Sequence, residues 1–323
     1  LRRKNSYFAF HLRRLLAIFE AAHIPTLVIK GAALALGAYG SLSLRQFEDI
    51  DLLVAPEQVH QALELAQAQG FVFTLPAQRS LTDLPEDEYH FQLQHPRWHI
   101  SLELHWKVGW REFNAREFPL SFAELNAQAR TLPLLDSSLR TPSLLHTLIL
   151  LGIDSLKERG VPLGRLLDAA LIARQPELDW DTLWSTAERI HALPETAALI
   201  GAAALLFDLP ESPALRVVQQ NAVARAAMRK ILRDAQRERP PTMLEQLYLY
   251  WRLRPGWDER QHYARRLIAD KQYRDYFAPR IGWDVLRSTA SSLRVEAWPG
   301  GKRLTRALNP LFQRARWRWR KRW

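Results

Sequence analysis

Two aspartates separated by a single residue stand out within an apolar run. The segment is Asp49-Ile-Asp-Leu-Leu-Val54, and its alternation predicts a strand with Asp49 and Asp51 on one face. Two carboxylates this close repel each other and raise each other's pKa unless a cation compensates them. Mg²⁺ binds one or two carboxylates and keeps positions open for substrate phosphates. The pair therefore indicates either a metal site for phosphoryl-type chemistry or two solvated carboxylates on an edge strand.

A third acid occurs in a later predicted strand, His99–Lys107. Alternation places Ser101, Glu103 and His105 on one side of this strand and apolar residues on the other. In a shared sheet, Glu103 would lie beside the two aspartates, whereas the simpler alternative leaves Glu103 and His105 on a solvated face. For His105 we favour a hydrogen-bonded structural role over that of a ligand or a base.

Potential anion-binding groups precede the acids. Lys30-Gly31-Ala32 ends one predicted strand and begins a helix, where backbone N–H groups attract phosphate and glycine permits close approach. Lys30 adds a point charge. Arg45 lies in the link before the acids and either neutralises a triphosphate or covers the surface. Together with the carboxylates, these groups form a coherent site for phosphoryl transfer, which no single one of them establishes.

The elements that must position these residues alternate between helix and strand. The pattern predicts a helix over the first twenty or so residues, a hairpin near residue 100, and several elements between them. These are strand Thr26–Ile29, helix Ala32–Tyr39, strand Asp49–Val54, helix Pro56–Gln69, strand Phe71–Leu75, and paired strands Tyr89–Gln94 and His99–Lys107. We predict an α/β (α+β) fold with one small mixed sheet and an N-terminal helix.

From Thr141 onward the periodicity is helical. The predicted helices are Pro142–Ile153, Pro162–Arg174, Trp180–His191, Thr196–Phe207, Pro213–Glu238 and Thr242–Leu253. We predict a catalytic domain over residues 1–135, an all-helical domain over 136–300 and a basic tail over 301–323. We expect His146, Asp154 and Asp168 mainly in caps and ion pairs, unless the helices close over the sheet and bring them to the substrates.

Composition excludes several classes of protein. The chain has no cysteine, so Cys-ligated zinc, iron–sulfur clusters and a cysteine nucleophile are excluded. Its longest apolar run, Ala197 to Phe207, has 11 residues, whereas a membrane span needs about 20. We therefore predict no transmembrane segment and a cytoplasmic location, with peripheral attachment to a membrane left open.

The positive charge is concentrated at the C-terminal end. Residues 301–323 contain nine of the 45 Lys and Arg residues and no acid, which leaves the rest of the chain nearly neutral. A basic segment with interleaved tryptophans is typical of binding to an anionic membrane surface or to single-stranded RNA. The alternative is that its apolar stripe packs against the helical domain.

The order of these motifs resembles the polymerase-β nucleotidyltransferase superfamily. Within it, the chain is most similar to a poorly characterised bacterial nucleotidyltransferase family over roughly residues 20–210. The residues that carry the resemblance are Lys30-Gly31, Tyr39, Arg45, Asp49-Ile50-Asp51, Glu103-Leu104-His105-Trp106, His146, Asp168 and Asp179-Trp180. The chain departs from the superfamily pattern at Gly31-Ala32-Ala33, where Gly-Gly or Gly-Ser is usual, and in having Glu103 as the third acid.

The resemblance implies transfer of a nucleoside monophosphate from an NTP, such as ATP, to an acceptor hydroxyl on a small molecule, peptide, sugar or RNA. It implies that Asp49, Asp51 and Glu103 are catalytic and hold two Mg²⁺ ions. Nucleotide binding would involve Lys30, Gly31, Ala32, Arg45 and His105. Two alternatives stay open: a catalytically silent module that binds nucleotide or a partner, and kinase-like phosphoryl transfer at the same site.

Overall fold

The computed structural model describes residues 2–74, 84, 88–108, 118–157, 162–209 and 212–235, together with residues 250, 251, 253, 256–258, 260, 261 and 263. The chain divides into two compact units, residues 1–112 with 116–237, and residues 113–115 with 238–323. All helices and strands named below belong to the first unit. The predicted boundaries at 135 and 300 stay predictions, and the basic tail over 301–323 lies outside the described residues.

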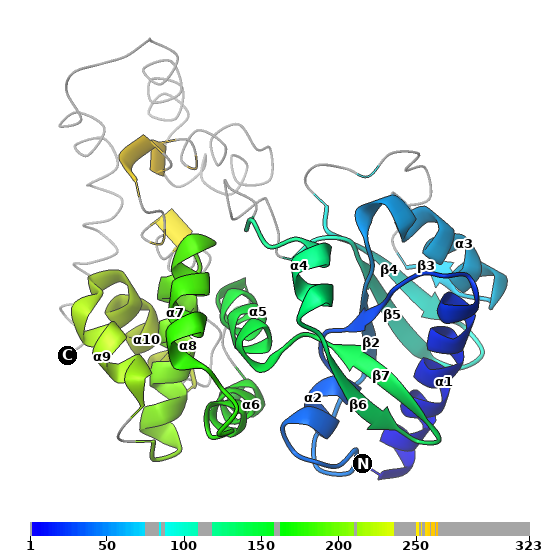
Figure 1. Ribbon diagram of the computed structural model, residues 1–323, viewed down its shortest axis with the longest axis horizontal. Helices are drawn as coiled ribbons and strands as arrows, with labels where there is room; N and C mark the ends of the chain where they lie inside the picture. Colours follow the sequence, from blue (N-terminus) through cyan, green and yellow to red (C-terminus); the bar gives the residue numbers. More distant parts are fainter. Residues whose placement is uncertain are drawn as a thin grey trace, which may run out of the picture. The chain divides into compact units, whose positions relative to one another are not determined.

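A five-stranded mixed sheet forms the centre of the N-terminal part of the chain, as predicted (Figure 1). Its order is β1-β2-β5-β4-β3, and the parallel pair β2–β5 is flanked by antiparallel neighbours. The strands are β1 (Leu27–Val28), β2 (Asp49–Leu53), β3 (Val72–Phe73), β4 (His90–His95) and β5 (Ile100–His105). Because β2 and β5 are parallel neighbours, residues distant in sequence meet at the same level of the sheet.

One face of this sheet is apolar and packs against two helices. Ile50 and Leu52 of β2 belong to a buried cluster with Leu102 of β5 and with residues of α1 (Arg2–Ala21) and α3 (Val59–Ala68). A short 3₁₀ turn, η1 (Pro56–Gln58), leads into α3. Since side chains alternate along a strand, the intervening Asp51 and Glu103 point to the opposite face.

A second, two-stranded sheet follows α4 (Phe122–Ala127). It consists of β6 (Arg130–Leu134) and β7 (Ser137–Thr141), and β7 packs beside β1. The sequence predicted no element here, because Pro133 interrupts the first strand and the second is largely polar. Leu134 and Leu139 anchor the hairpin in the main core, which explains why it forms despite its weak pattern.

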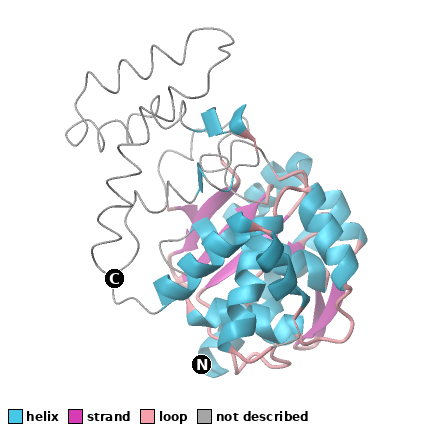
Figure 2. Ribbon diagram, turned by 90° about the vertical axis from the view of Figure 1, so that its left-hand side faces the viewer, coloured by secondary structure: helices cyan, strands magenta, loops and turns pink. Residues whose placement is uncertain are grey.

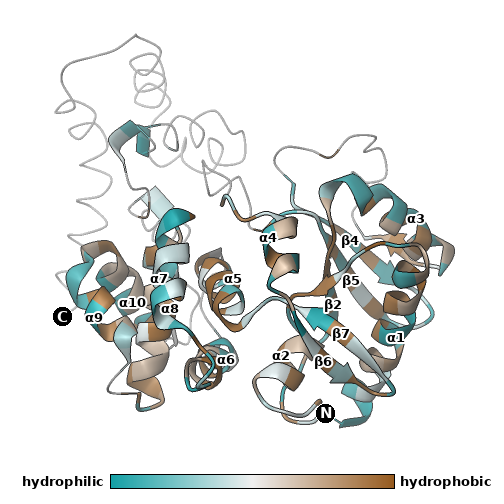
Figure 3. Cartoon of the chain, in the orientation of Figure 1, coloured by the Kyte–Doolittle hydropathy of each residue, from teal (hydrophilic) through white to brown (hydrophobic). Residues whose placement is uncertain are grey.

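The rest of the first unit is helical, as Figure 2 shows by its colouring. Helix α8 (Leu193–Leu206) lies at the centre of this region and contacts all the other helices that follow α4. Those helices are α5 (Leu144–Lys157), α6 (Leu163–Ala173), α7 (Trp180–Arg189), α9 (Pro213–Gln220) and α10 (Ala222–Ala235). Hydrophobic residues cover much of α5 (Figure 3), in keeping with its position between the sheet and α8.

The single helix predicted over Pro213–Glu238 is wrong. The helix is interrupted at Asn221, where the backbone is extended. The side-chain oxygen of Asn221 accepts hydrogen bonds from the backbone N–H groups of Val223 and Ala224. Asparagine is a strong N-cap, so it starts α10 as a new helix. Most of the helix predicted over Thr242–Leu253 lies outside the described residues. None of the helices that the structure describes is long and apolar enough to span a membrane.

Candidate active site

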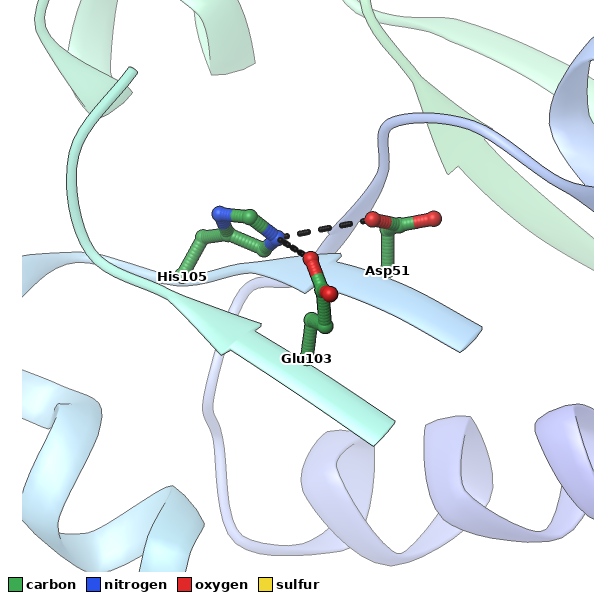
Figure 4. Close-up of side chains that lie close together, drawn as sticks. All are labelled: Asp51, Glu103 and His105. Atoms are coloured by element: carbon green, nitrogen blue, oxygen red, sulfur yellow. Dashed lines mark ion pairs between the residues drawn. The ribbon is translucent and has the colours of Figure 1, made fainter. Parts of the chain in front are cut away.

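The pairing of β2 with β5 brings two predicted acids together. Asp51 lies directly opposite Glu103 in the register of the parallel pair. Figure 4 shows both carboxylates converging with the imidazole of His105, which follows Glu103 on the same face. His105 Nε2 lies 3.2 Å from Glu103 Oε2 and 3.5 Å from Asp51 Oδ1. One ligand atom from each of these three residues falls within 4.8 Å of the others, a spacing compatible with a metal ion.

Asp49, the third predicted acid, lies on the same face of β2, opposite Ser101. It is partly buried and stands outside the tight group of Asp51, Glu103 and His105. Burial raises the pKa of Asp49 to about 6, and the negative charges of Asp51 and Glu103 act in the same direction. The structure therefore brings all three acids to one face, with Asp49 at its margin.

The other two carboxyl groups are held in the ionised form. Burial opposes ionisation of Asp51, but the Lys30 ammonium and the nearby His105 lower its pKa to about 2. For Glu103 burial is likewise outweighed by His105, so its pKa also falls below the usual value. His105 itself has a raised pKa, because its contacts with the two carboxylates overcome the effect of burial. The group is thus a compact arrangement of opposite charges.

Lys30 lies two residues beyond the end of β1, and its side chain joins the acid face of the sheet to α5. Its Nζ atom is 2.7 Å from Asp154 Oδ2 and 3.5 Å from Asp51 Oδ1. Burial opposes the charge on Lys30, yet Asp154 and then Asp51 raise its pKa well above the ordinary value. The sequence singled out both Lys30 and Asp154, but no local signal indicated that they would meet.

Gly31 makes the corner that follows Lys30. Its φ is 50°, and a Cβ atom there would lie 3.4 Å from the carbonyl oxygen of Asp49. Glycine therefore allows the chain to turn against β2 before α2 (Ala32–Gly37) begins. The assignment of the Gly31 and Ala32 backbone to phosphate binding stays a prediction.

Arg45 is bound to a helix of the helical region. Its Nε and Nη2 atoms donate to the two carboxylate oxygens of Asp168 at 2.8 and 2.9 Å, and Tyr39 Oη donates to Asp168 Oδ1 at 2.7 Å. Asp168, on α6, is completely buried. The sequence expected Arg45 either at a triphosphate or on the surface; the structure shows it in a partly buried bidentate pair.

Tyr89 and His90, the residue before β4 and its first residue, adjoin the site and were not singled out from the sequence. His90 pairs with His105 across the strands and stacks on it, with ring centroids 5.1 Å apart. The ring centroid of Tyr89 lies 5.6 Å from that of His105. Burial and then the charge of Glu103 raise the pKa of Tyr89. The antiparallel hairpin was the available signal, because its register aligns His90 with His105.

The donor set fits a divalent cation. Asp51 is 2% exposed, and its Oδ2 atom is buried without a hydrogen-bond partner among the described residues. A buried anionic oxygen left without a donor is costly unless a cation or water meets it. Carboxylate oxygens suit Mg²⁺ or Mn²⁺, and the imidazole of His105 adds a ligand that transition metals accept.

Comparisons with known proteins place the chain in a family. No curated protein matches it. A crystal structure of ANT(2'')-Ia in complex with adenylyl-2''-tobramycin matches with 16% identity and a TM-score of 0.35, covering 68% of this chain and 96% of that one. A solution structure of the antibiotic-resistance factor ANT(2'')-Ia matches with 13% identity and a TM-score of 0.34, covering 67% and 97%.

A single family model matches residues 1–208, more than half of the chain. That span includes every acid and cation of the site described above. By this match, the chain belongs to the family described as uncharacterised nucleotidyltransferases.

Proposed function

We propose that this protein is a Mg²⁺-dependent nucleotidyltransferase that moves a nucleoside monophosphate from an NTP to an acceptor hydroxyl. One observation carries the proposal. Asp51 and Glu103 face each other across parallel strands, and the buried Asp51 Oδ2 has no hydrogen-bond partner among the described residues. Membership in a nucleotidyltransferase family supports the choice of nucleotide as donor substrate.

Asp49, Asp51 and Glu103 would hold the metal. When bound, Mg²⁺ supplies a Lewis acid that stabilises the charge developing on the phosphoryl oxygens. Lys30 and the backbone N–H groups of Gly31 and Ala32 are assigned to the triphosphate in this proposal.

The chain's own groups then position the substrates and accept a proton. The acceptor oxygen forms a bond to the α-phosphorus, the bond from that phosphorus to the bridging oxygen breaks, and pyrophosphate leaves. Glu103 takes the proton of the attacking hydroxyl, and His105 orients that carboxylate through its contact at 3.2 Å. Arg45 adds positive potential at Asp49 while its guanidinium stays bonded to Asp168.

Pyrophosphate release tests this proposal. The protein is incubated with Mg²⁺, each labelled NTP and a panel of hydroxyl acceptors that includes sugars, peptides and RNA ends. We expect pyrophosphate from the wild type and a loss of about 10³-fold or more in Asp51→Asn, since charge stabilisation of this kind supplies several kcal/mol. Asp136→Asn is the matched control, because it removes an exposed carboxylate on the β6–β7 turn.

The products and a binding measurement separate the alternatives. Release of nucleoside diphosphate in place of pyrophosphate would indicate phosphoryl transfer. Thermal stabilisation by Mg²⁺ and NTP, without product from any acceptor, would favour a silent binding module. If Mg²⁺ and NTP raise the melting temperature of Asp51→Asn as much as that of the wild type, the metal-binding role of Asp51 is wrong.

A further inference from the structure

The ammonium group of Lys30 occupies a fixed position beside the acid face. Asp154 holds it from α5 at 2.7 Å, and Asp51 Oδ1 lies 3.5 Å away on the other side. Both acids are largely buried, and the Lys30 side chain is only 26% exposed. A positive charge is therefore built into the site by a residue of the sheet and a residue of the helical region.

The two oxygens of Asp51 have different surroundings. Oδ1 lies 3.5 Å from both Lys30 Nζ and His105 Nε2. Oδ2 is buried and accepts no hydrogen bond from the residues that the structure describes. Two-metal centres hold their ions about 3.5–4 Å apart, a distance at which a shared carboxylate gives one oxygen to each ion. Here the Lys30 ammonium, 3.5 Å from Oδ1, already supplies a positive charge beside Asp51 that a second ion would otherwise supply.

We propose that Lys30, held by Asp154, takes the place of a second metal ion, so that the protein without nucleotide binds a single divalent cation through Asp51 and Glu103. The inference rests on the proposed function and differs from the two ions that the family resemblance implies. Asp154 is then a positioning residue, because it acts on the metal centre only through Lys30.

The number of bound Mn²⁺ ions tests the inference. Full-length protein is titrated with Mn²⁺ in the absence of nucleotide, free Mn²⁺ is measured by electron paramagnetic resonance, and the enthalpy is measured by calorimetry. We expect one ion per chain for the wild type. In Lys30→Met, Asp51 and Asp154 both lose the ammonium that lies within 3.5 Å of each, so we expect a second ion and about tenfold or more tighter binding of the first.

The double variant Lys30→Met/Asp154→Asn is the matched control. It lacks the ammonium as well, but it also lacks the carboxylate that would complete a second site, so we expect one ion again. Lys30→Gln replaces Lys30→Met if melting curves show that the methionine variant does not fold, since glutamine keeps a hydrogen-bond donor for Asp154.

The outcomes distinguish this inference from the proposed function. Two ions in the wild type, or one ion in the Lys30 variants that retain Asp154, would overturn the inference and leave the proposed metal site intact. If wild type and Asp51→Asn both bind no Mn²⁺, or bind it equally, the metal site of the proposed function fails, and the inference fails with it.

Discussion

The buried carboxylate of Asp168 offers a quantitative test of the contact between α6 and the segment that links α2 to β2. Its two oxygens accept two hydrogen bonds from Arg45 and one from Tyr39, and its side chain is 0% exposed. Removing one partner of a buried pair typically costs about 3–5 kcal/mol, because the other charge stays buried. Arg45 is 21% exposed, so water compensates part of this loss. We expect Asp168→Asn to lower the free energy of unfolding by about 3 kcal/mol.

Urea unfolding of the variant and of a matched control measures this effect. Asp136→Asn makes the same substitution in the pair with Arg13, where the carboxylate is 72% exposed, and should cost less than about 1 kcal/mol. In a double-mutant cycle, Arg45→Met and Asp168→Asn should together cost about 2 kcal/mol less than the sum of their separate effects. A loss below about 1 kcal/mol in Asp168→Asn, or additive effects in the cycle, would refute the reasoning.

Three further predictions concern packing, ionisation and capping. In Gly152→Ala, the new Cβ would lie 2.8 Å from Thr196 Cα; we expect a loss of about 1–3 kcal/mol in urea unfolding, whereas Gly164→Ala, with nothing within 4 Å, should gain up to about 1 kcal/mol. Burial raises the folded-state pKa of Asp49 to about 6, so its ionisation destabilises the metal-free fold progressively as pH rises from about 4, the ordinary carboxyl value, and fully above about 6. Asp49→Asn should therefore stabilise the protein in EDTA by about 2 kcal/mol at pH 8 and hardly at all at pH 4, and equal effects at both would contradict this. Asn221→Ala removes the N-cap of α10 and should lower the free energy of unfolding by about 1 kcal/mol. The helical signal in circular dichroism should be correspondingly lower.

Much of the sheet could be predicted from the sequence because its strands carry strong local patterns. The alternation in Asp49–Val54 and in His99–Lys107 predicted which residues face the core, and the structure confirms this for Ile50, Leu52 and Leu102. The β6–β7 hairpin was missed because its stability comes from Leu134 and Leu139 in the main core, a contact that no local pattern reveals.

The acids of the site could be predicted as well, but the partners of its cations could not. Period-two alternation was enough to place Asp51 and Glu103 on the polar face of their strands. The β2–β5 register then aligns the two residues on the same face of the sheet. The pairs Lys30–Asp154 and Arg45–Asp168 join residues more than 120 positions apart in the chain. Such pairs depend on how α5 and α6 pack against the sheet, which helical periodicity does not determine.

The parallel pairing of β2 and β5 has a consequence for the order in which the chain can fold during synthesis. Residues 49 and 103 are separated by α3, β3 and β4, so the acid face cannot form until the ribosome has released β5. Until then β2 has only the two-residue β1 as a neighbour in the sheet. Non-local strand pairing of this kind is slow because loop closure precedes the stabilising contacts. The nascent protein would therefore acquire its charged centre late, after most of its N-terminal half had been translated.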